Sequence, residues 1–179
     1  MFNIGDTVVY GTTGVCTVED IKPLTGVRGA DKKKLYYVLD PMFRKEKIYS
    51  PVDSDKIFIR RVMTREEAEH LIDMIPDIKA EFCTESKVQE LSEYYKEKLR
   101  THDSEALVEV TKSIYAKKKY VEEHKRKIGQ IDETYMKQAE ELLFGELSVA
   151  LSMDMDEVKD YIVERVGNMT GDMPTENDR

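Results

Sequence analysis

The chain of 179 residues has no tryptophan and only two cysteines, Cys16 and Cys83, which lie 67 positions apart. Two cysteines cannot build a framework of several disulfides, and the chain has no CxxC pair of the kind that marks a zinc site. No stretch approaches the roughly 18 consecutive apolar residues that a membrane-spanning helix needs. The length suits one large domain or two small ones, with enough chain to bury a core.

Signals for export or membrane insertion are also missing. The first ten residues, MFNIGDTVVY, contain no basic segment followed by an apolar run, so we expect neither a signal peptide nor a membrane anchor. We therefore expect a cytoplasmic protein. Charged residues make up 36% of the chain and aromatic residues 8%, a balance that favours a helix-rich protein with a modest core.

The charge is unevenly distributed along the chain. The net charge of −8 argues against a protein that coats nucleic acid nonspecifically. Residues 1–63 hold 11 basic and 8 acidic residues, a net +3, whereas residues 64–179 hold 17 and 28, a net −11. Within that acidic half, residues 112–127 hold 7 basic and 2 acidic residues, so one basic island lies in it.

The first 63 residues have the pattern of β-structure. Short β-branched or alternating runs separated by Gly, Pro and Asp predict strands near residues 7–10, 15–21, 35–39, 47–50 and 57–62. Alternation in the second run predicts Cys16 and Val18 on one face and Ile21 on the other. The connections leave no room for crossover helices, so we expect an antiparallel barrel or sandwich.

The rest of the chain has helical periodicity. Thr64 and Glu67 form a capping box before a helix that ends at Pro76, and a second helix is expected over residues 85–100. Asp103, Asp132 and Asp154 are expected to cap three more helices. The predicted fold is therefore α+β, with a β domain at 1–63, an all-α domain of about five helices at 64–166, and a disordered tail at 167–179.

Residues that could support catalysis are sparse. His70, His102 and His124 lie 32 and 22 positions apart, so no two of them form a helical metal-binding pair. The GTTG segment at residues 11–14 lacks the ending of a phosphate-binding loop and is better explained as a turn between strands. We therefore expect a protein that is not an enzyme and that has no metal site and no cofactor.

Aromatic and basic side chains gather on two of the predicted strands. Tyr36 and Tyr37 are adjacent, so one is expected to face the core and the other the outer surface. Tyr49 follows in the next strand, near Arg44 and Lys47. These residues either pack across strands or mark an edge that accepts a strand from a partner protein.

The basic island consists of two lysine-rich triplets, Lys117-Lys118-Lys119 and Lys125-Arg126-Lys127. One interpretation is a solvated helix end, where cations complement the negative end of the helix dipole. The other is a set of phosphate contacts that position the protein on DNA. The sequence alone does not separate the two.

Several motifs, in this order, resemble the CarD-like family of bacterial transcription regulators, whose β module also occurs in the transcription–repair coupling factor. The resemblance covers roughly residues 2–165. It rests on an opening Phe2-x-Ile4-Gly5-Asp6-Thr7-Val8-Val9-Tyr10, on Tyr36-Tyr37-Val38-Leu39 and Ile48-Tyr49-Ser50-Pro51-Val52, on Arg60-Arg61-Val62, and on Ala106-Leu107-Val108-Glu109-Val110 and Ala139-x-x-Leu142-Leu143-x-Gly145-Glu146-Leu147.

The resemblance implies a Tudor-like or SH3-like barrel that docks on the RNA polymerase β subunit by pairing strand edges. It also implies a helical domain that contacts promoter DNA at the upstream edge of the melted bubble, where a tryptophan wedge stabilises the open complex. This chain departs from that pattern, because the wedge position falls at Val88 and the following Arg-Arg is Glu90-Leu91. Apolar wedges other than tryptophan also kink DNA, and Tyr94 or Tyr95 is an alternative.

We therefore expect a bacterial transcription regulator, monomeric when free, with RNA polymerase β subunit and promoter DNA as partners and no membrane association. The residues expected at the polymerase are Tyr36, Arg44, Lys47, Ile48 and Tyr49. Those expected at DNA are Val88, Tyr95, Lys117, Lys118, Lys119, Lys125, Arg126 and Lys127. The alternative is a polymerase-bound adaptor whose acidic helical half binds another protein.

Overall fold

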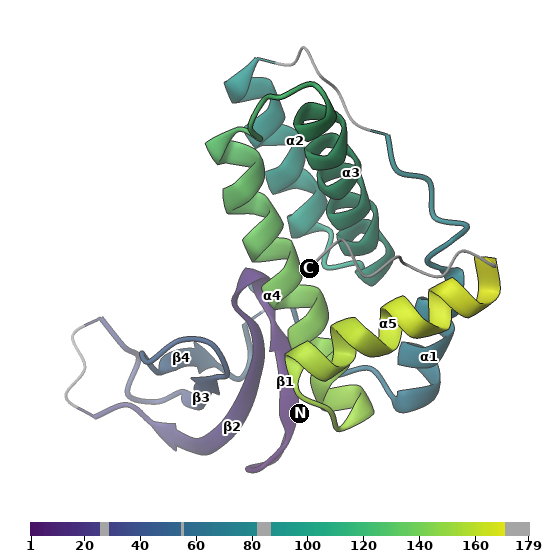
Figure 1. The fold of residues 1–179 in the computed structure, drawn as a ribbon. Coiled ribbons are helices and arrows are strands. Elements are labelled where there is room, and N and C mark those ends of the chain that lie inside the picture. The colour runs from purple at the N-terminus through teal and green to yellow at the C-terminus, as the bar shows by residue number, and fades with distance from the viewer. Residues whose placement is uncertain (26–28, 55, 82–86, 171–179) are drawn as a thin grey trace. The chain divides into compact units, whose positions relative to one another are not determined.

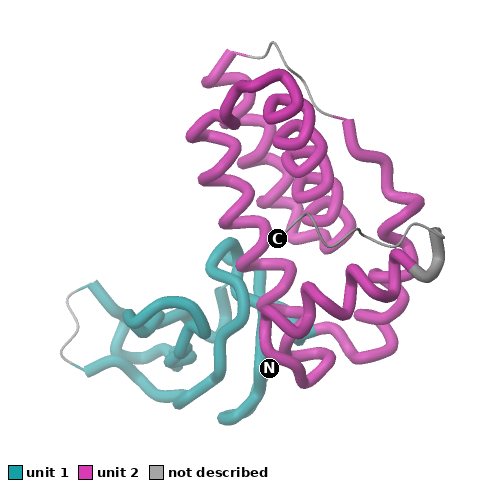
Figure 2. Tube along the Cα trace, in the orientation of Figure 1, with its two compact units in different colours: residues 1–62 teal, residues 63–179 magenta. Residues whose placement is uncertain are grey.

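A computed structural model of the chain describes residues 1–25, 29–54, 56–81 and 87–170, without the side chains of residues 168–170. The chain divides into two compact units, residues 1–62 and 63–179 (Figure 2). We call them the β unit and the helical unit. The boundary expected from the sequence lies one residue further along, after residue 63.

The β unit is one antiparallel sheet of five strands, as predicted. The strands pair in the order β4-β3-β2-β1-β5, so β4 and β5 are the edges. Figure 1 labels β1 to β4. Their bounds are β1 Thr7–Tyr10, β2 Gly14–Pro23, β3 Leu35–Pro41, β4 Ile48–Pro51 and β5 Ile59–Arg61, with a short 3-10 helix η1 at Gly11–Thr13.

One face of the sheet carries the apolar core of the β unit, and a β-bulge changes which residues join it. Val18 and Ile21 both pack in this cluster together with buried Cys16. The predicted placement of Ile21 on the opposite face was wrong, because the register shifts between Val18 and Asp20. An extra residue in a bulge inverts the alternation of every residue after it.

Cys16 is fully buried in this core. Burial raises the pKa of its thiol to about 11, so the thiol stays protonated at neutral pH. The cysteine therefore acts as a small apolar core residue. Cys83 lies outside the described residues.

The helical unit contains five helices among its described residues, as predicted. Thr64 caps the first helix, and its hydroxyl and the Glu67 carboxylate form the predicted capping box. Helices α2, α3 and α4 pack side by side, and α1 and α5 pack on each other and on α4 (Figure 1). The bounds are α1 Arg65–Met74, α2 Val88–Arg100, α3 Ser104–Glu123, α4 Gln130–Leu151 and α5 Met155–Thr170.

Two predicted helix ends in this unit were wrong. The N-cap of α4 is Gly129, not Asp132, which lies in the first turn with its side chain buried. Helix α5 continues to Thr170, four residues into the segment expected to be disordered. A nucleated helix propagates through its backbone hydrogen bonds without apolar periodicity, and the next proline comes only at Pro174. Residues 171–179 lie outside the described part.

Side-chain contacts between segments far apart in the sequence tie the helical unit together. The Glu146 carboxylate accepts a hydrogen bond from the Met63 N–H at 2.9 Å, which fixes the segment entering α1. Asp73 and Arg165 link α1 to α5 through two hydrogen bonds of 2.6 and 2.8 Å, and Arg165 lowers the pKa of Asp73. Within the described residues, no helix has the length and apolar character needed to cross a membrane.

Candidate partner-binding edge and nucleic-acid interface

Strand β4 is an edge of the sheet, and its hydrogen-bond pattern shows which main-chain groups are left over. The Val52 N–H donates to the Leu35 carbonyl at 3.0 Å, so Leu35 and Val52 are a hydrogen-bonded pair. Because such pairs alternate in an antiparallel ladder, Ile48 and Ser50 also face β3. The N–H and C=O of Tyr49 therefore face away from β3, toward the side where the described residues supply no further strand.

Pro51 agrees with this assignment. It pairs with Tyr36, at a position where the main chain of β4 faces outward. A proline at this position costs no ladder hydrogen bond, since its missing N–H would not have faced β3. The outer side of β4 therefore offers the N–H of Tyr49 as a donor and carbonyls as acceptors.

The side chains at this edge divide into core and surface. Ile48 packs against the apolar core and Ser50 is buried, whereas 48% of Tyr49 is exposed. Arg44 is exposed in the β3–β4 turn. Lys47 is also exposed, but its ammonium group is held by the Glu19 carboxylate at 2.6 Å. Tyr49 and Arg44 are thus the predicted side chains best placed to meet a partner.

Tyr36 is not one of them, and the expectation that one of the two adjacent tyrosines faces outward was wrong. Both are buried, with 7% of Tyr36 and 3% of Tyr37 exposed. The Tyr36 hydroxyl accepts a hydrogen bond from the Asp31 N–H, and that of Tyr37 accepts one from the Phe2 N–H. Each hydroxyl therefore has a hydrogen-bond partner, which lets both rings be buried.

Two exposed apolar residues near this edge were not predicted from the sequence. Met42 and Phe43 lie in the turn between β3 and β4, with 51% and 37% of each exposed. Two adjacent large apolar residues in a turn otherwise rich in charge are the signal that could have identified them. They are exposed apolar side chains in the turn that leads into β4.

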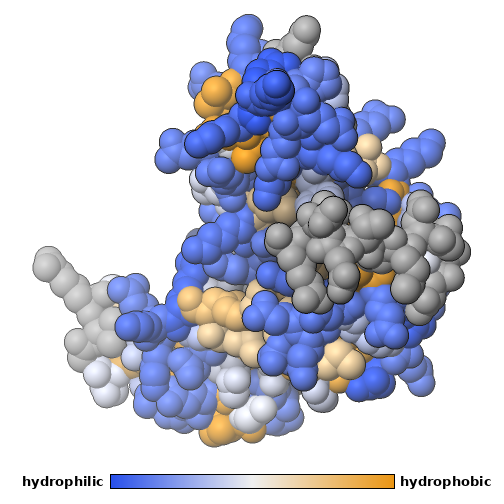
Figure 3. Space-filling view, in the orientation of Figure 1, coloured by the Kyte–Doolittle hydropathy of each residue, from blue (hydrophilic) through white to orange (hydrophobic). Residues whose placement is uncertain are grey.

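In the helical unit, five members of the basic island form a cationic surface at the end of α3 and the turn that follows. We use "cationic surface" for Lys118, Lys119, Lys125, Arg126 and Lys127, all exposed. None of the five makes a salt bridge with a described residue. This part of the unit lies in a surface that is mainly hydrophilic in the view of Figure 3.

The turn after α3 is held in a Schellman motif with an unusual residue. The Lys125 N–H donates to the Glu122 carbonyl at 2.9 Å and the Arg126 N–H to the Val121 carbonyl at 2.8 Å. Lys125 takes the left-handed position at φ 55°, where glycine is the usual residue. A residue with a side chain at this position costs about 1 kcal/mol or more in backbone strain. Despite this cost, the position is occupied by an exposed lysine.

Lys117 does not belong to this surface, which corrects its predicted contact with DNA. Its ammonium group contacts both carboxylate oxygens of Asp132, at 2.9 and 2.8 Å, with 12% and 4% of the two side chains exposed. The Tyr95 hydroxyl donates to the same carboxylate at 2.8 Å. Lys117 lies on the inward side of α3 and joins α2, α3 and α4 in one buried polar cluster.

Replacing Lys117 by methionine is expected to lower the free energy of unfolding by about 3 kcal/mol, because Asp132 is left buried without a counter-charge. Urea denaturation of the full chain measures this loss. Lys118→Met, one residue away on the exposed side, is the matched control and should change stability by less than about 0.5 kcal/mol. Equal midpoints for the two variants would contradict the structural role of Lys117.

Tyr95 is buried as well, so its predicted role as a DNA wedge was wrong. Only 3% of it is exposed. Burial and the hydrogen bond to Asp132 raise the pKa of its hydroxyl, which remains a donor. Tyr94 is 37% exposed, and its hydroxyl donates to Glu109. Val88 is 66% exposed at the first turn of α2, so it is the apolar residue that is free to contact a ligand there.

Comparison with known proteins identifies the β unit. Residues 2–63 match the family model of the CarD-like/TRCF RID domain, an RNA polymerase-interacting domain. The matched residues include β4 and end at the first residue of the helical unit, so the cationic surface lies outside the match. No curated protein matches the chain.

Proposed function

Because residues 2–63 belong to the CarD-like/TRCF RID domain family, we propose that the chain is a non-enzymatic regulator of transcription that acts in the cytoplasm, bound to RNA polymerase. The family match is the observation that carries this proposal. It supports a transcription-related role at the polymerase, and the outward main-chain groups of β4 give a physical means of attachment.

The polymerase β subunit is the proposed partner of β4. An extended strand of that subunit would pair with the N–H and C=O of Tyr49, while the Tyr49 ring and Arg44 contact its side chains. Main-chain pairing supplies the affinity, and the flanking side chains supply the specificity. Met42 and Phe43 add apolar area beside the paired strands.

Promoter DNA is the proposed partner of the helical unit. The five cations of the cationic surface are exposed and make no salt bridge with a described residue, so they are available to phosphates. Contacts of this kind position a protein on DNA without reading its sequence. Holding DNA beside the polymerase would stabilise the open complex, with Val88 as a small apolar wedge.

The experiment that tests this function has two arms. In the first, the full chain is captured on the isolated β-subunit lobe, and we expect a stable complex. In the second, promoter footprints are recorded with polymerase at several salt concentrations, and we expect protection that weakens as salt rises. If the β-subunit lobe does not capture the full chain, polymerase binding through this subunit is contradicted. If the lobe captures the chain but the promoter is not protected, the result supports the alternative of a polymerase-bound adaptor whose helical half binds another protein. The net charge of −11 on residues 64–179 favours that alternative.

A further inference from the structure

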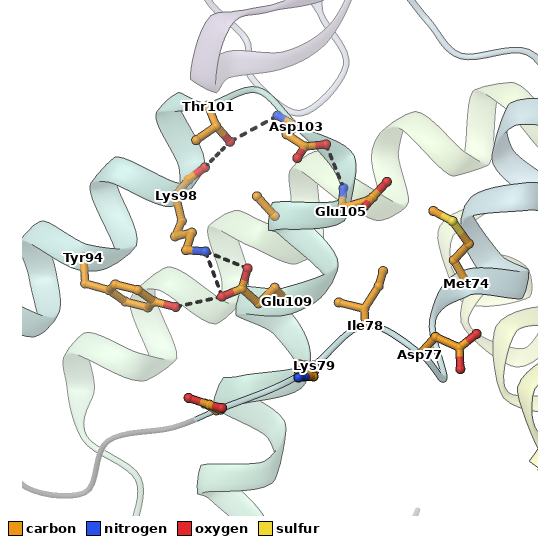
Figure 4. Close-up of a pocket in the computed structure, with 12 residues that line it drawn as sticks. Met74, Asp77, Ile78, Lys79, Tyr94, Lys98, Thr101, Asp103, Glu105 and Glu109 are labelled. Carbon is orange, nitrogen blue, oxygen red and sulfur yellow. Dashed lines mark hydrogen bonds and ion pairs between the residues drawn. The ribbon is translucent and has the colours of Figure 1, made fainter.

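A groove opens on the helical unit, near the beginning of α3 and away from the cationic surface. It has a volume of about 710 Å³ and is bounded by α1 and the segment after it, by α2, and by the first half of α3. Figure 4 shows Tyr94 and Lys98 on one side and Met74 and Asp77 on the other. The volume falls in the range of known binding pockets, about 300–1,000 Å³.

The floor of the groove is apolar. Ala106 is buried, and Met74 and Ile78 are half-buried where they line the space. The Tyr94 ring forms part of the wall and remains 37% exposed. This combination offers contact area to an aliphatic chain, while the Lys98 ammonium lies over the Tyr94 ring, 5.7 Å from its centroid.

The residues that line the groove carry more negative than positive charge. Glu109 is already occupied, because Lys98 contacts its carboxylate at 2.6 Å. Four further acids line the groove, and none of them makes a salt bridge with a described residue: Asp77, Glu81, Asp103 and Glu105. Lys79 is the remaining cation among the lining residues, so an excess of negative charge surrounds an apolar floor.

We propose that this groove binds a basic segment of a partner protein by taking up an arginine side chain. The aliphatic stem of the arginine lies on Ile78 and Ala106, and its guanidinium reaches Asp77 and Glu105. A guanidinium fits better than an ammonium group, because it pairs with carboxylates in a planar fork. DNA does not fit, because its phosphates would face the acidic rim.

The groove and the cationic surface are far enough apart to act together. Helix α3 has 20 residues, so its ends lie about 30 Å apart at 1.5 Å per residue. The groove involves Glu105 in the first turn of α3, and the cationic surface follows its last turn. A basic protein segment and a DNA backbone could therefore be bound at once, which goes beyond the proposed function and does not depend on it.

The test is isothermal titration of the full chain with an acetylated hexapeptide containing two arginines and two leucines. We expect saturable binding at 50 mM salt that weakens at 300 mM. The same peptide with citrulline in place of arginine should not bind, because citrulline keeps the shape and loses the charge. Asp77→Asn with Glu105→Gln should weaken binding by about tenfold. The matched control, Asp160→Asn with Glu164→Gln on α5, should leave it unchanged.

A second measurement identifies the site without relying on the fold of a variant. Methyl resonances of Ile78 and Ala106 in the wild-type chain should shift on titration, and Asp77→Asn with Glu105→Gln should remove the preference for an arginine over a lysine peptide. Equal binding of the citrulline peptide, or equal affinity of the groove variant and its control, would overturn the proposal. So would salt-sensitive dimers abolished by Lys125→Glu, since the occupant would then be a second copy of the chain.

Discussion

Replacing Tyr49 by proline is expected to abolish binding to the polymerase β subunit while the β unit remains folded. The Tyr49 N–H faces away from β3, so its loss breaks no hydrogen bond inside the sheet. In the variant, the partner strand would find no N–H at residue 49 and would contact the proline ring instead. The partner carbonyl that would have accepted this hydrogen bond would be buried without a donor. We expect affinity to fall by at least about 100-fold, measured by biolayer interferometry with the isolated β-subunit lobe.

Two further variants separate the main chain from the side chain. Ile48→Pro removes an N–H that faces β3, so it should disrupt the sheet itself and lower the melting temperature, unlike Tyr49→Pro. Tyr49→Thr keeps the outward N–H and removes the ring, so it should retain most of the binding. If Tyr49→Pro is folded by circular dichroism and binds as tightly as wild type, strand addition at β4 is wrong.

Much of the fold could be predicted because its signals are local. The capping box at Thr64 and Glu67 is contained in four residues, and the structure confirms it. The five strands follow from alternation and from turn residues, and their antiparallel order follows from short connections. The same holds for Asp103, whose carboxylate caps α3 by accepting the Glu105 N–H.

The errors arose where a contact or a change of register outside the local pattern decided the outcome. Asp132 has the local pattern of an N-cap, but Lys117 and Tyr95 satisfy its carboxylate from two other helices. Ile21 lies on the core face because of a bulge that the alternation does not reveal. Tyr36 is buried because Asp31 in the preceding loop supplies its hydrogen-bond partner. None of these partners is visible from sequence spacing alone.

The kind of site could be predicted from the sequence more readily than the individual residues that form it. The basic island was recognisable from charge, but the separation of Lys117 from Lys118 and Lys119 depends on which side of α3 faces α4. Three consecutive lysines point in three directions on a helix, so their surroundings can differ even though their side chains are the same. A test that changes all three would therefore mix a loss of stability with a loss of binding.

Charge reversal in the exposed turn alone is expected to weaken DNA binding by about 500-fold at 0.1 M salt. The variant replaces Lys125, Arg126 and Lys127 by glutamate. The estimate follows from three lost phosphate contacts, each worth about 0.9 in the slope of log K against log salt. The slope itself should become shallower by about 2.7. Fluorescence anisotropy of labelled promoter DNA should be measured on the chain bound to polymerase, which supplies the effective concentration that an acidic helical unit needs.

Lys125→Gly distinguishes a functional cation from a solvated helix end within the same turn. Glycine removes the strain of a side chain at φ 55°, so we expect the free energy of unfolding to rise by about 1 kcal/mol. The same variant loses one phosphate contact and should bind DNA about eightfold more weakly at 0.1 M salt. A more stable protein that binds DNA less well would show that Lys125 contributes to binding at the expense of stability. A gain in stability with unchanged DNA affinity would assign the turn to the helix end alone.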